Sequence, residues 1–345
     1  MGHLLIDAAL GRPVSRTPVW IMRQAGRYMP EYRALRQKYS FLELCHTPEA
    51  AVAASMLPID MLGVDGAIIF SDILIPLEAM GMNLQFDEGK GPILSDPIRS
   101  RSEIGRLRAY DANKETRFLP DAVRMLKAEL AGRVPVLGFA GAPYTLACYA
   151  VEGKTARHYS ATKSFMLNDR EGFKELLFRF ADAAADLLIA QIEAGAELVQ
   201  LFDTWAGDLM PDEFRAMALP AAAHVIERVK ATGCPIVYFV NGVGGKLEDI
   251  ASSGADVIGI DWRVGLTEVR QRLGQGVVLQ GNLDPCTLYA RPDVIAARVR
   301  DVLAENGRGP HIFNLGHGIM PDVPVAHAKA LVDAVKTFGA PGGYA

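Results

Sequence analysis

The sequence lacks the features that mark nucleic-acid-binding, disulfide-rich and membrane proteins. Its 36 Lys and Arg against 40 Asp and Glu give a formal net charge of −4, whereas general nucleic-acid binders present a basic face. No apolar run approaches the length of a membrane span. Its cysteines are widely spaced and form no C-x-x-C pair, so we expect reduced thiols at Cys45, Cys148, Cys234 and Cys286.

Targeting and metal-binding patterns are also missing. The apolar patch in MGHLLIDAALGRPVSRTP follows no basic region, and Ile6 stands where a myristoylation signal needs Ser or Thr. We therefore expect a cytoplasmic protein. The sequence contains neither H-x-C nor H-E-x-x-H, and the neighbours Cys45 and His46 would ligate one ion poorly. We predict no metal site.

The sequence does contain eight short apolar runs that alternate with longer amphipathic segments. Strands that are apolar on both faces belong in a parallel sheet covered by helices. This count predicts a (β/α)8 TIM barrel, one domain over residues 1–345 with a short N-terminal extension. The alternative is a doubly wound sheet, but RQAGRY stands where that fold has a Gly-rich turn. The runs are 18–23, 66–70, 134–140, 196–203, 235–240, 256–261, 276–282 and 311–316.

Several intervening segments carry helix signals. Residues 173–195 place apolar side chains on one stripe that stops at Gly195. Thr47 is a candidate N-cap before Pro48, and Ser100 with Glu103 has the spacing of a capping box. We also expect a helix over 292–306, ended by Gly307, and a last one near 324–338.

In a barrel of this kind the chemistry gathers at the C-terminal ends of the strands. Six of the eight predicted ends carry an acidic, basic or histidine side chain, which indicates a polar mouth with both signs of charge. The stretch NGVGGK at 241–246 is interpreted as a tight turn with some N–H groups for an anion. The candidates are Arg23, Arg27, Asp72, Tyr149, Asp203, Thr204, Asn241, Asp261, Asn282, Asp284 and His317.

Each candidate has a structural alternative. Asp72 could be a helix cap, although its apolar neighbours in IIFSDILIP mean that a buried carboxylate there needs a strong partner. His317 could be a turn residue, but the glycines on either side favour a close backbone approach to a ligand or a strained turn. Tyr149 could simply pack. Asp261 and Asp284 are interpreted as structural, and the role of Asn241 stays open.

Two lysines raise the question of Schiff-base chemistry. Lys154 and Lys246 lie outside the apolar strand ends. Desolvation that would lower a lysine pKa is therefore not expected at either residue. We discount both.

Positive charge is concentrated in MRQAGRYMPEYRALR, residues 22–36, which holds four arginines. The structural interpretation is a solvated turn paired with Glu31 or Glu43. The functional interpretation is a binding site for carboxylates or phosphates, because guanidinium groups match the geometry of both. An arginine-rich loop over a barrel mouth predicts a small polyanionic ligand, and Asp72 suggests that this ligand also has N–H donors or becomes cationic.

These segments resemble the uroporphyrinogen decarboxylase family. PVWIMRQAGRYMPEYR is similar to the family's N-terminal signature, and FSDILIP, GFAGAPYTLACYAVEG and FNLGHGIMPD match its later motifs in order. The resemblance runs from about residue 13 to residue 338. Tyr144 replaces a frequent Trp, and Thr204 replaces a frequent Ser but keeps the hydroxyl.

The resemblance implies a homodimeric barrel without cofactor or metal that removes four acetate carboxyls from uroporphyrinogen III in haem biosynthesis, giving coproporphyrinogen III. Asp72, Arg23 and Tyr149 would be catalytic, with Asp72 stabilising a protonated pyrrole. Arg23 or Arg27 would deliver or relay the proton, although a guanidinium group, which keeps its proton in proteins, is a poor general acid. The implied substrate-binding set is Arg23, Gln24, Ala25, Gly26, Arg27, Asp72, Tyr149, Thr204 and His317.

Two other functions are weighed against this one. A corrinoid methyltransferase of the same superfamily would need zinc held by His and Cys near the later strand ends, where this sequence has Asn241 and no H-x-C. A non-catalytic tetrapyrrole carrier would need the arginines but no carboxylate beside the pyrrole nitrogens.

Overall fold

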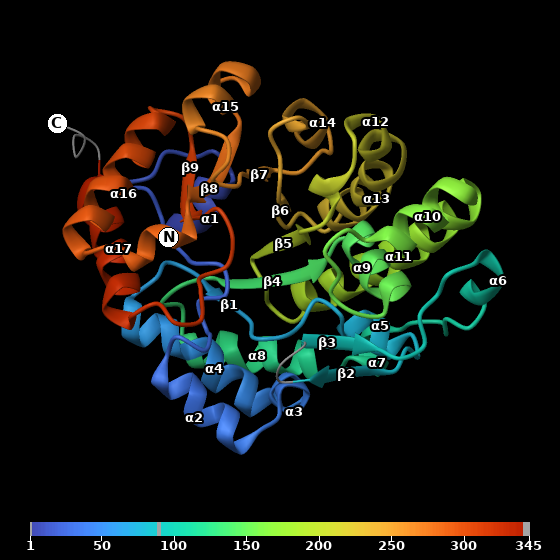
Figure 1. Cartoon of the computed structure of the whole chain (residues 1–345). Coiled ribbons are helices and arrows are strands. Elements are labelled where there is room, and N and C mark those ends of the chain that lie inside the picture. The colour runs from blue at the N-terminus through green and yellow to red at the C-terminus, as the bar shows by residue number, and fades with distance from the viewer. Residues whose placement is uncertain (1, 88–90, 341–345) are drawn as a thin grey trace.

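A curled sheet of seven parallel strands forms the centre of the molecule (Figure 1). The computed structural model describes residues 2–87 and 91–340. Every neighbouring pair in the sheet is parallel, as the apolar runs predict. In spatial order the strands are β1 (Ala67–Ile68), β4 (Val136–Gly141), β5 (Leu198–Asp203), β6 (Ile236–Val240), β7 (Val257–Gly259), β8 (Val278–Leu283) and β9 (His311–Leu315).

The first predicted strand, 18–23, is only a single β-bridge, between Val19 and Phe313. Asp65, which precedes β1, donates its N–H to the Val19 carbonyl at 2.7 Å, so this segment lies between the two edges of the sheet. Pairing stops there because Ile21 turns back and accepts the N–H of Gln24 at 2.9 Å. The sheet is therefore TIM-barrel-like but is not closed by eight regular strands, which corrects the prediction of a complete (β/α)8 barrel.

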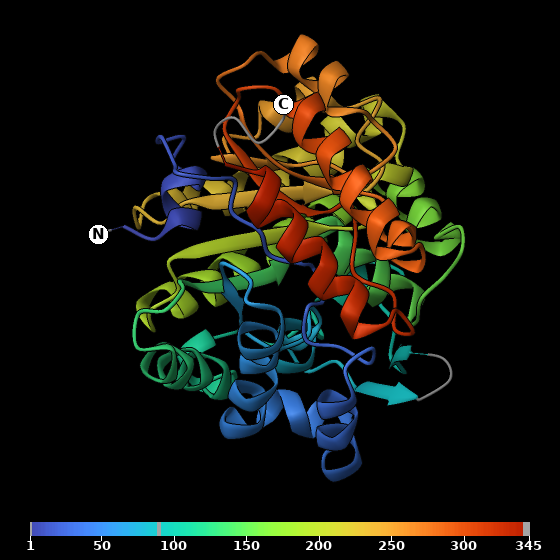
Figure 2. The ribbon, with the colours of Figure 1, turned by 90° about the vertical axis from the view of Figure 1, so that its left-hand side faces the viewer.

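An antiparallel hairpin that the sequence reading did not predict lies outside the main sheet. It consists of β2 (Leu84–Asp87) and β3 (Gly91–Leu94). Figure 2 shows it at the edge of the molecule, next to the helices of the N-terminal third. Leu84–Asp87 does alternate apolar and polar residues, but over only four positions, and Gly91–Leu94 does not. Neither forms a continuous apolar run of the kind used to predict the strands.

Helices cover the outside of the sheet. The longest is α11, and α16 and α17 lie side by side in Figures 1 and 2. The helices are α1 (Leu4–Ala9), α2 (Pro30–Lys38), α3 (Phe41–His46), α4 (Pro48–Leu62), α5 (Ile75–Ala79), α6 (Arg101–Ile104), α7 (Ala112–Glu115), α8 (Phe118–Leu130), α9 (Pro143–Glu152), α10 (Ser160–Asn168), α11 (Arg170–Glu193), α12 (Pro211–Glu213), α13 (Leu219–Lys230), α14 (Leu247–Ala251), α15 (Leu266–Leu273), α16 (Pro292–Asn306) and α17 (Val325–Phe338). Short 3-10 turns occupy Ala206–Asp208 and Pro285–Tyr289, and a π-turn occupies Phe214–Ala218.

The predicted helices over 173–195, 292–306 and 324–338 are confirmed within a few residues by α11, α16 and α17. The capping details differ. Ser100 precedes α6 but does not cap it: its hydroxyl pairs with that of Ser102, and the Glu103 carboxylate accepts the N–H of Arg99. The complete capping box is at Ser40 and Glu43, before α3.

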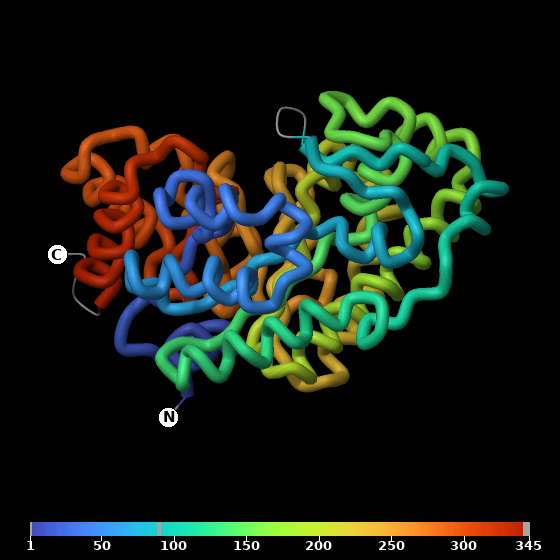
Figure 3. The backbone as a smooth tube through the Cα atoms, turned by 90° about the horizontal axis from the view of Figure 1, so that it is seen from below, coloured from blue at the N-terminus to red at the C-terminus, as the bar shows by residue number. Residues whose placement is uncertain are grey.

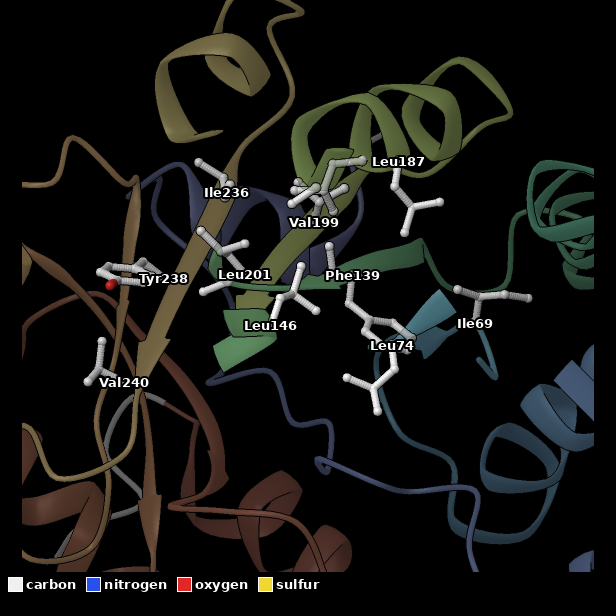
Figure 4. Close-up of a cluster of buried hydrophobic side chains, with 14 of the residues drawn as sticks. Ile69, Leu74, Phe139, Leu146, Leu187, Val199, Leu201, Ile236, Tyr238 and Val240 are labelled. Atoms are coloured by element: carbon white, nitrogen blue, oxygen red, sulfur yellow. The ribbon is translucent and has the colours of Figure 1, made fainter. Parts of the chain in front are cut away.

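Each central strand is buried on both faces, by two different sets of neighbours. Figure 4 shows Ile236, Tyr238 and Val240 of β6 in the cluster between the sheet and its outer helices. The residues between them, Val237 and Phe239, belong to a second cluster inside the curl. This alternation follows from the period of two along a strand.

The short helix α1 closes the end of the curl at which the strands begin. Its Leu5, Ala8 and Ala9 pack into the interior cluster together with Trp20. Figure 3 shows α16 and α17, in orange and red, on the same side of the molecule as the first described residues, in dark blue. No helix in the described part of the chain is long and apolar enough to cross a bilayer. Because α1 covers the end at which the strands begin, the open end of the curl is the one at the C-terminal ends of the strands.

Candidate active site

A cavity of about 1220 Å³ lies at the C-terminal ends of the strands. Its wall includes the loop before α2, the loop after β1, the hairpin strands β2 and β3, and the turn after β9. The structure brings all of the sequence-predicted binding residues to this one cavity: Arg23, Gln24, Ala25, Gly26, Arg27, Asp72, Tyr149, Thr204 and His317.

The loop that carries Arg23 and Arg27 is irregular, since α2 begins only at Pro30. Both side chains are exposed in the cavity wall. Within residues 2–87 and 91–340, neither guanidinium has an ion pair or a side-chain hydrogen bond. The alternative in which this turn pairs with Glu31 or Glu43 is therefore wrong for these two arginines. The Glu43 carboxylate instead accepts the N–H of Ser40 at 2.8 Å.

Arg33 and Arg36 complete the cationic side of the cavity. Unlike the first two, they have partners in the protein. Arg33 donates to the carbonyl of Arg27 at 2.8 Å. Arg36 lies 5.5 Å from the centre of the Phe41 ring. All four arginines of the N-terminal segment therefore surround one hollow, and two of them keep their donors for a ligand.

Asp72 lines the same cavity from the loop after β1. The N–H of Leu74 donates to its carboxylate at 2.8 Å. Burial raises the pKa of Asp72 to about 6, against the lowering effects of the Leu74 N–H and the charge of Arg23. Asp72 is thus a carboxylate held in a poorly solvated place, where a cationic partner would stabilise it.

His317 stands on the turn after β9, and its ring lies 6.2 Å from that of Phe239. Burial, with the charges of Arg23 and Arg263, lowers its pKa to about 4, so the imidazole is neutral at pH 7. The neighbouring glycines serve the protein itself. A Cβ on Gly316 would lie 2.5 Å from the backbone nitrogen of Trp262, and one on Gly318 would clash with the side chain of Arg23. Both glycines therefore allow close contacts within the protein, with Trp262 and with Arg23.

Tyr149, on α9, and Thr204, directly after β5, face the cavity beside Trp205. The rings of Tyr149 and Trp205 are 6.3 Å apart in an edge-to-face arrangement. Burial raises the pKa of Tyr149 above its ordinary value, and the charge of Asp72 adds to this effect. The phenol is therefore protonated and can donate a hydrogen bond.

A row of aromatic rings in the cavity wall was missed by reasoning from the sequence. Phe139, Phe202 and Phe239 come from three adjacent strands, with ring centres 5.8 and 6.1 Å apart along the row, and His317 continues it. A prediction based on ionisable groups at the strand ends leaves these phenylalanines out. Phenylalanines next to those ends were the available signal. They give the cavity an apolar surface for a flat or ring-shaped ligand.

Other strand-end residues lie outside the cavity wall. Asp203 is fully buried and accepts the hydroxyls of Thr145 and Tyr238. Asp261 is buried and accepts the N–H groups of Gly242 and Arg263. Asp284 accepts the N–H of Cys286 at 2.9 Å and begins a 3-10 turn. These contacts are structural ones, as interpreted for Asp261 and Asp284.

The loop 241–246 does not offer the anion site suggested for it at Gly242, whose N–H is taken by Asp261. Asn241 accepts the guanidinium of Arg263 at 2.8 Å. Lys246 is buried and donates to the carbonyl of Gly207 at 2.8 Å. Its burial lowers the pKa of Lys246, contrary to the expectation of no desolvation. Lys246 is not in the cavity wall, so the conclusion against a Schiff base there is unchanged.

The fold and the cavity define a class of protein: a TIM-barrel-like protein whose open end holds a large cavity lined by arginines, one aspartate and aromatic rings. In the overall fold the chain is similar to a methyltransferase from Methanosarcina mazei, with a TM-score of 0.83, 21% identity and 97% of each chain covered. Identity this low shows the shared fold alone.

Sequence comparisons identify the family. The family model for uroporphyrinogen decarboxylase matches residues 2–338. The chain is 47% identical to uroporphyrinogen decarboxylase of Syntrophotalea carbinolica, over 96% of both chains. It is 46% identical to that of Geobacter metallireducens, over 97% of this chain and 98% of the other. The chain belongs to the uroporphyrinogen decarboxylase family and is a carboxy-lyase.

Proposed function

We propose that the cavity removes the four acetate carboxyls of uroporphyrinogen III in haem biosynthesis, with the pyrrole ring as electron sink in place of a cofactor. One observation carries the proposal. Asp72, a carboxylate in a poorly solvated site, lines the same hollow as Arg23 and Arg27, whose guanidinium groups have no ion pair among the described residues. This pairing of charges matches a substrate that is negative at its rim and becomes positive at its ring.

Decarboxylation leaves an electron pair on carbon, which must be delocalised. A proton added to the ring carbon beside the acetate-bearing carbon converts the pyrrole to an iminium-like cation. The bond to the carboxylate then breaks, CO2 leaves, and its electron pair neutralises the cation by forming an exocyclic methylene. Protonation of that methylene and loss of the ring proton give a methyl group. The net change consumes one proton and releases one CO2.

Asp72 has two tasks in this scheme. Its carboxylate accepts hydrogen bonds from the pyrrole N–H groups, and its charge stabilises the cation that follows protonation. A fixed charge in a water-poor cavity acts on the transition state without reorganising first. The raised pKa of Asp72 supports this role, since its environment favours any partner that neutralises the ionised form.

The other residues hold and orient the substrate. Arg23 and Arg27 bind its carboxylates, and Arg23 also lies close enough to Asp72 to affect the pKa of that group. Thr204 donates its hydroxyl to a carboxylate, and neutral His317 donates one N–H to a propionate. Tyr149 orients Asp72 or the reacting acetate. The cavity volume of about 1220 Å³ exceeds the usual upper range of about 1,000 Å³ for drug-sized ligands, as a tetrapyrrole requires.

We also propose that the chain is one catalytic domain and that it forms a homodimer. The cavity draws on Arg23 near the start of the chain and His317 near its end, which supports one catalytic domain. A homodimer is implied by the family resemblance and is tested by light scattering of the purified protein after size exclusion.

The experiment that tests the proposal is an anaerobic assay with uroporphyrinogen III. The protein is first dialysed against a chelator, and no cofactor or metal is added. We expect products with progressively fewer carboxyls, ending at coproporphyrinogen III, detected by fluorescence after oxidation. A requirement for an added metal or organic cofactor would overturn the mechanism while leaving the family assignment in place.

The same assay separates the alternatives. A carrier would bind uroporphyrinogen and return it unchanged. A zinc-dependent methyltransferase would contain stoichiometric zinc, measurable by metal analysis of the protein as purified. Across residues 2–87 and 91–340, no three His, Cys, Asp or Glu side chains lie together as a set of metal ligands. That alternative rests on the distant likeness in fold.

A further inference from the structure

Arg23 occupies a backbone position that favours glycine. Its φ is +63°, in the left-handed region. The N–H of Gln24 donates to the carbonyl of Ile21 at 2.9 Å, so Arg23 is the third residue of a four-residue turn. A turn with positive φ at that place usually carries Gly or Asn. An arginine persists there only if its surroundings hold the turn in place.

The first of these surroundings is the side chain of Gln24. It is fully buried, although the sequence reading placed it among the substrate-binding residues. Its Oε1 accepts the N–H of Ile21 at 3.1 Å, and its Nε2 donates to the carbonyl of Gly66 at 2.9 Å. Both ends of the amide are therefore used by the backbone. Gln24 fastens the turn to the segment just before β1.

The second is Asn314, which is fully buried in β9. Its Oδ1 accepts the N–H of Met22 at 3.0 Å and the N–H of Leu315 at 2.8 Å. The carbonyl of Met22 accepts the N–H of Ile319 at 2.9 Å. The residue before Arg23 is thus held on both of its backbone groups by the far end of the chain.

The third is Gly318, where the absence of a side chain makes room for the arginine. A Cβ at this position would lie 2.3 Å from Cδ, 2.8 Å from Cγ and 2.9 Å from Nε of Arg23. Such contacts are too short for the arginine to stay where it is. The backbone of Gly318 is not in the left-handed region, so alanine would meet no strain of its own.

We propose that Gln24, Asn314 and Gly318 are positioning residues that fix Arg23 in the cavity before substrate arrives. Three buried residues from two distant parts of the sequence converge on one exposed arginine. A clamp whose geometry is fixed in advance loses less freedom when it binds a carboxylate. This inference rests on the proposed function, in which Arg23 binds substrate.

The test compares Arg23→Ala, Gly318→Ala and the double variant by anaerobic kinetics. We expect each single change to lower kcat/KM by about tenfold to a hundredfold, the effect of losing a hydrogen bond to a charged group. The two changes should divide their effect between KM and kcat in the same proportion. In the double variant, Gly318→Ala should cost less than about twofold more, because residues that act through one group are not additive.

Gly309→Ala is a matched control. A Cβ there would lie 2.3 Å from Cζ of another arginine, Arg270, which is buried outside the cavity. Arg270 donates to Asn306 at 2.7 Å and to the carbonyl of Pro310 at 2.8 Å. Gly309→Ala should therefore lower Tm with KM and kcat unchanged at a temperature where it is folded. Gly318→Ala should change the kinetic constants and leave Tm nearly unchanged.

Gln24→Met keeps the volume of the side chain and removes both of its hydrogen bonds, so it repeats the test if Gly318→Ala does not fold. The Kd for coproporphyrinogen replaces kcat/KM where turnover is too slow to measure. Full activity of Arg23→Ala would overturn the proposed role of Arg23 itself. An impaired Arg23→Ala beside an active Gly318→Ala, or additive losses in the double variant, would overturn the positioning inference alone.

Discussion

Asp72 and Asp203 are carboxylates near strand ends, the first half-buried and the second fully buried, and the protein treats them differently. Burial raises the pKa of each to about 6. Asp203 is the last residue of β5 and receives two hydroxyls, from Thr145 at 2.8 Å and from Tyr238 at 2.9 Å. Asp72 receives the backbone N–H of Leu74 at 2.8 Å and faces the cavity.

The difference shows what separates a structural carboxylate from a functional one. A shifted pKa does not, because the two shifts agree. The partners do. A buried charge needs donors, and the core supplies them for Asp203. Asp72 has fewer donors within the fold and an opening toward solvent, so a ligand with N–H groups can supply the rest. Substitutions at Asp72, at Asp203 and at its partner Tyr238 should therefore have different effects on activity and on stability.

Asp72→Asn should lower kcat by about 10²- to 10³-fold, the range seen when one preorganised electrostatic group is lost from an active site. The amide keeps an oxygen for the N–H of Leu74 but has no charge for the pyrrole cation. Anaerobic turnover of uroporphyrinogen measures the loss. Tm should stay near that of the wild type. Turnover close to the wild-type rate would remove Asp72 from the mechanism.

Tyr238→Phe acts on the other carboxylate. It removes one of the two hydroxyls that Asp203 accepts and keeps the ring that packs among the outer helices. We expect a loss of about 2 kcal/mol in the free energy of unfolding at pH 8, the scale of a hydrogen bond to a charged group. Urea denaturation measures it. A large rise in KM with unchanged stability would show that Asp203 belongs to the site after all.

The pH profile of kcat/KM should follow Asp72. With a pKa of about 6 for this group, the ionised form is lost as the pH falls below 6. Between pH 7 and pH 5 we expect kcat/KM to fall by about tenfold, since kcat/KM reports the ionisation of the free enzyme. The residual activity of Asp72→Asn should lack this acid limb. A wild-type rate that rises toward low pH would instead make Asp72 the proton donor.

Much of the fold could be predicted from the sequence because parallel strands buried on both faces leave continuous apolar runs. All seven strands of the main sheet, β1, β4, β5, β6, β7, β8 and β9, lie to within one residue inside runs located in this way. The run 18–23 looks the same in sequence but ends in a turn. Gln24 bonds this turn to the carbonyl of Gly66, and Asn314 of β9 accepts the N–H of Met22. Contacts between such distant residues leave no local pattern, so this segment could not be distinguished from a strand.

The composition of the site was only partly predictable, for a related reason. Strand-end position brings Asp72, Thr204 and His317 to one cavity, and that position is visible in the sequence. Whether a side chain at a strand end turns to the cavity or to the core depends on the period of two and on the exact last residue. Phe202 lines the cavity and Asp203, its neighbour, does not. A one-residue difference in strand end was beyond the sequence alone.

The smallest effect concerns stability against pH, through Asp203→Asn. The pKa of Asp203 is about 6 in the folded protein and near 3.8 unfolded, so the folded state binds the extra proton in between. Asp203 thus contributes stability below its unfolded pKa that is lost as the pH rises through 6. All other groups titrate alike in wild type and variant and cancel. From pH 5 to pH 7 the unfolding free energy of the wild type should fall by roughly 1 kcal/mol relative to that of the variant.

Asp293→Asn is the control: Arg291 lowers the pKa of this exposed group, which titrates below that interval, so no shift should appear. An equal shift in both variants, measured by urea denaturation at the two pH values, would show that Asp203 is not held in the core as its contacts indicate.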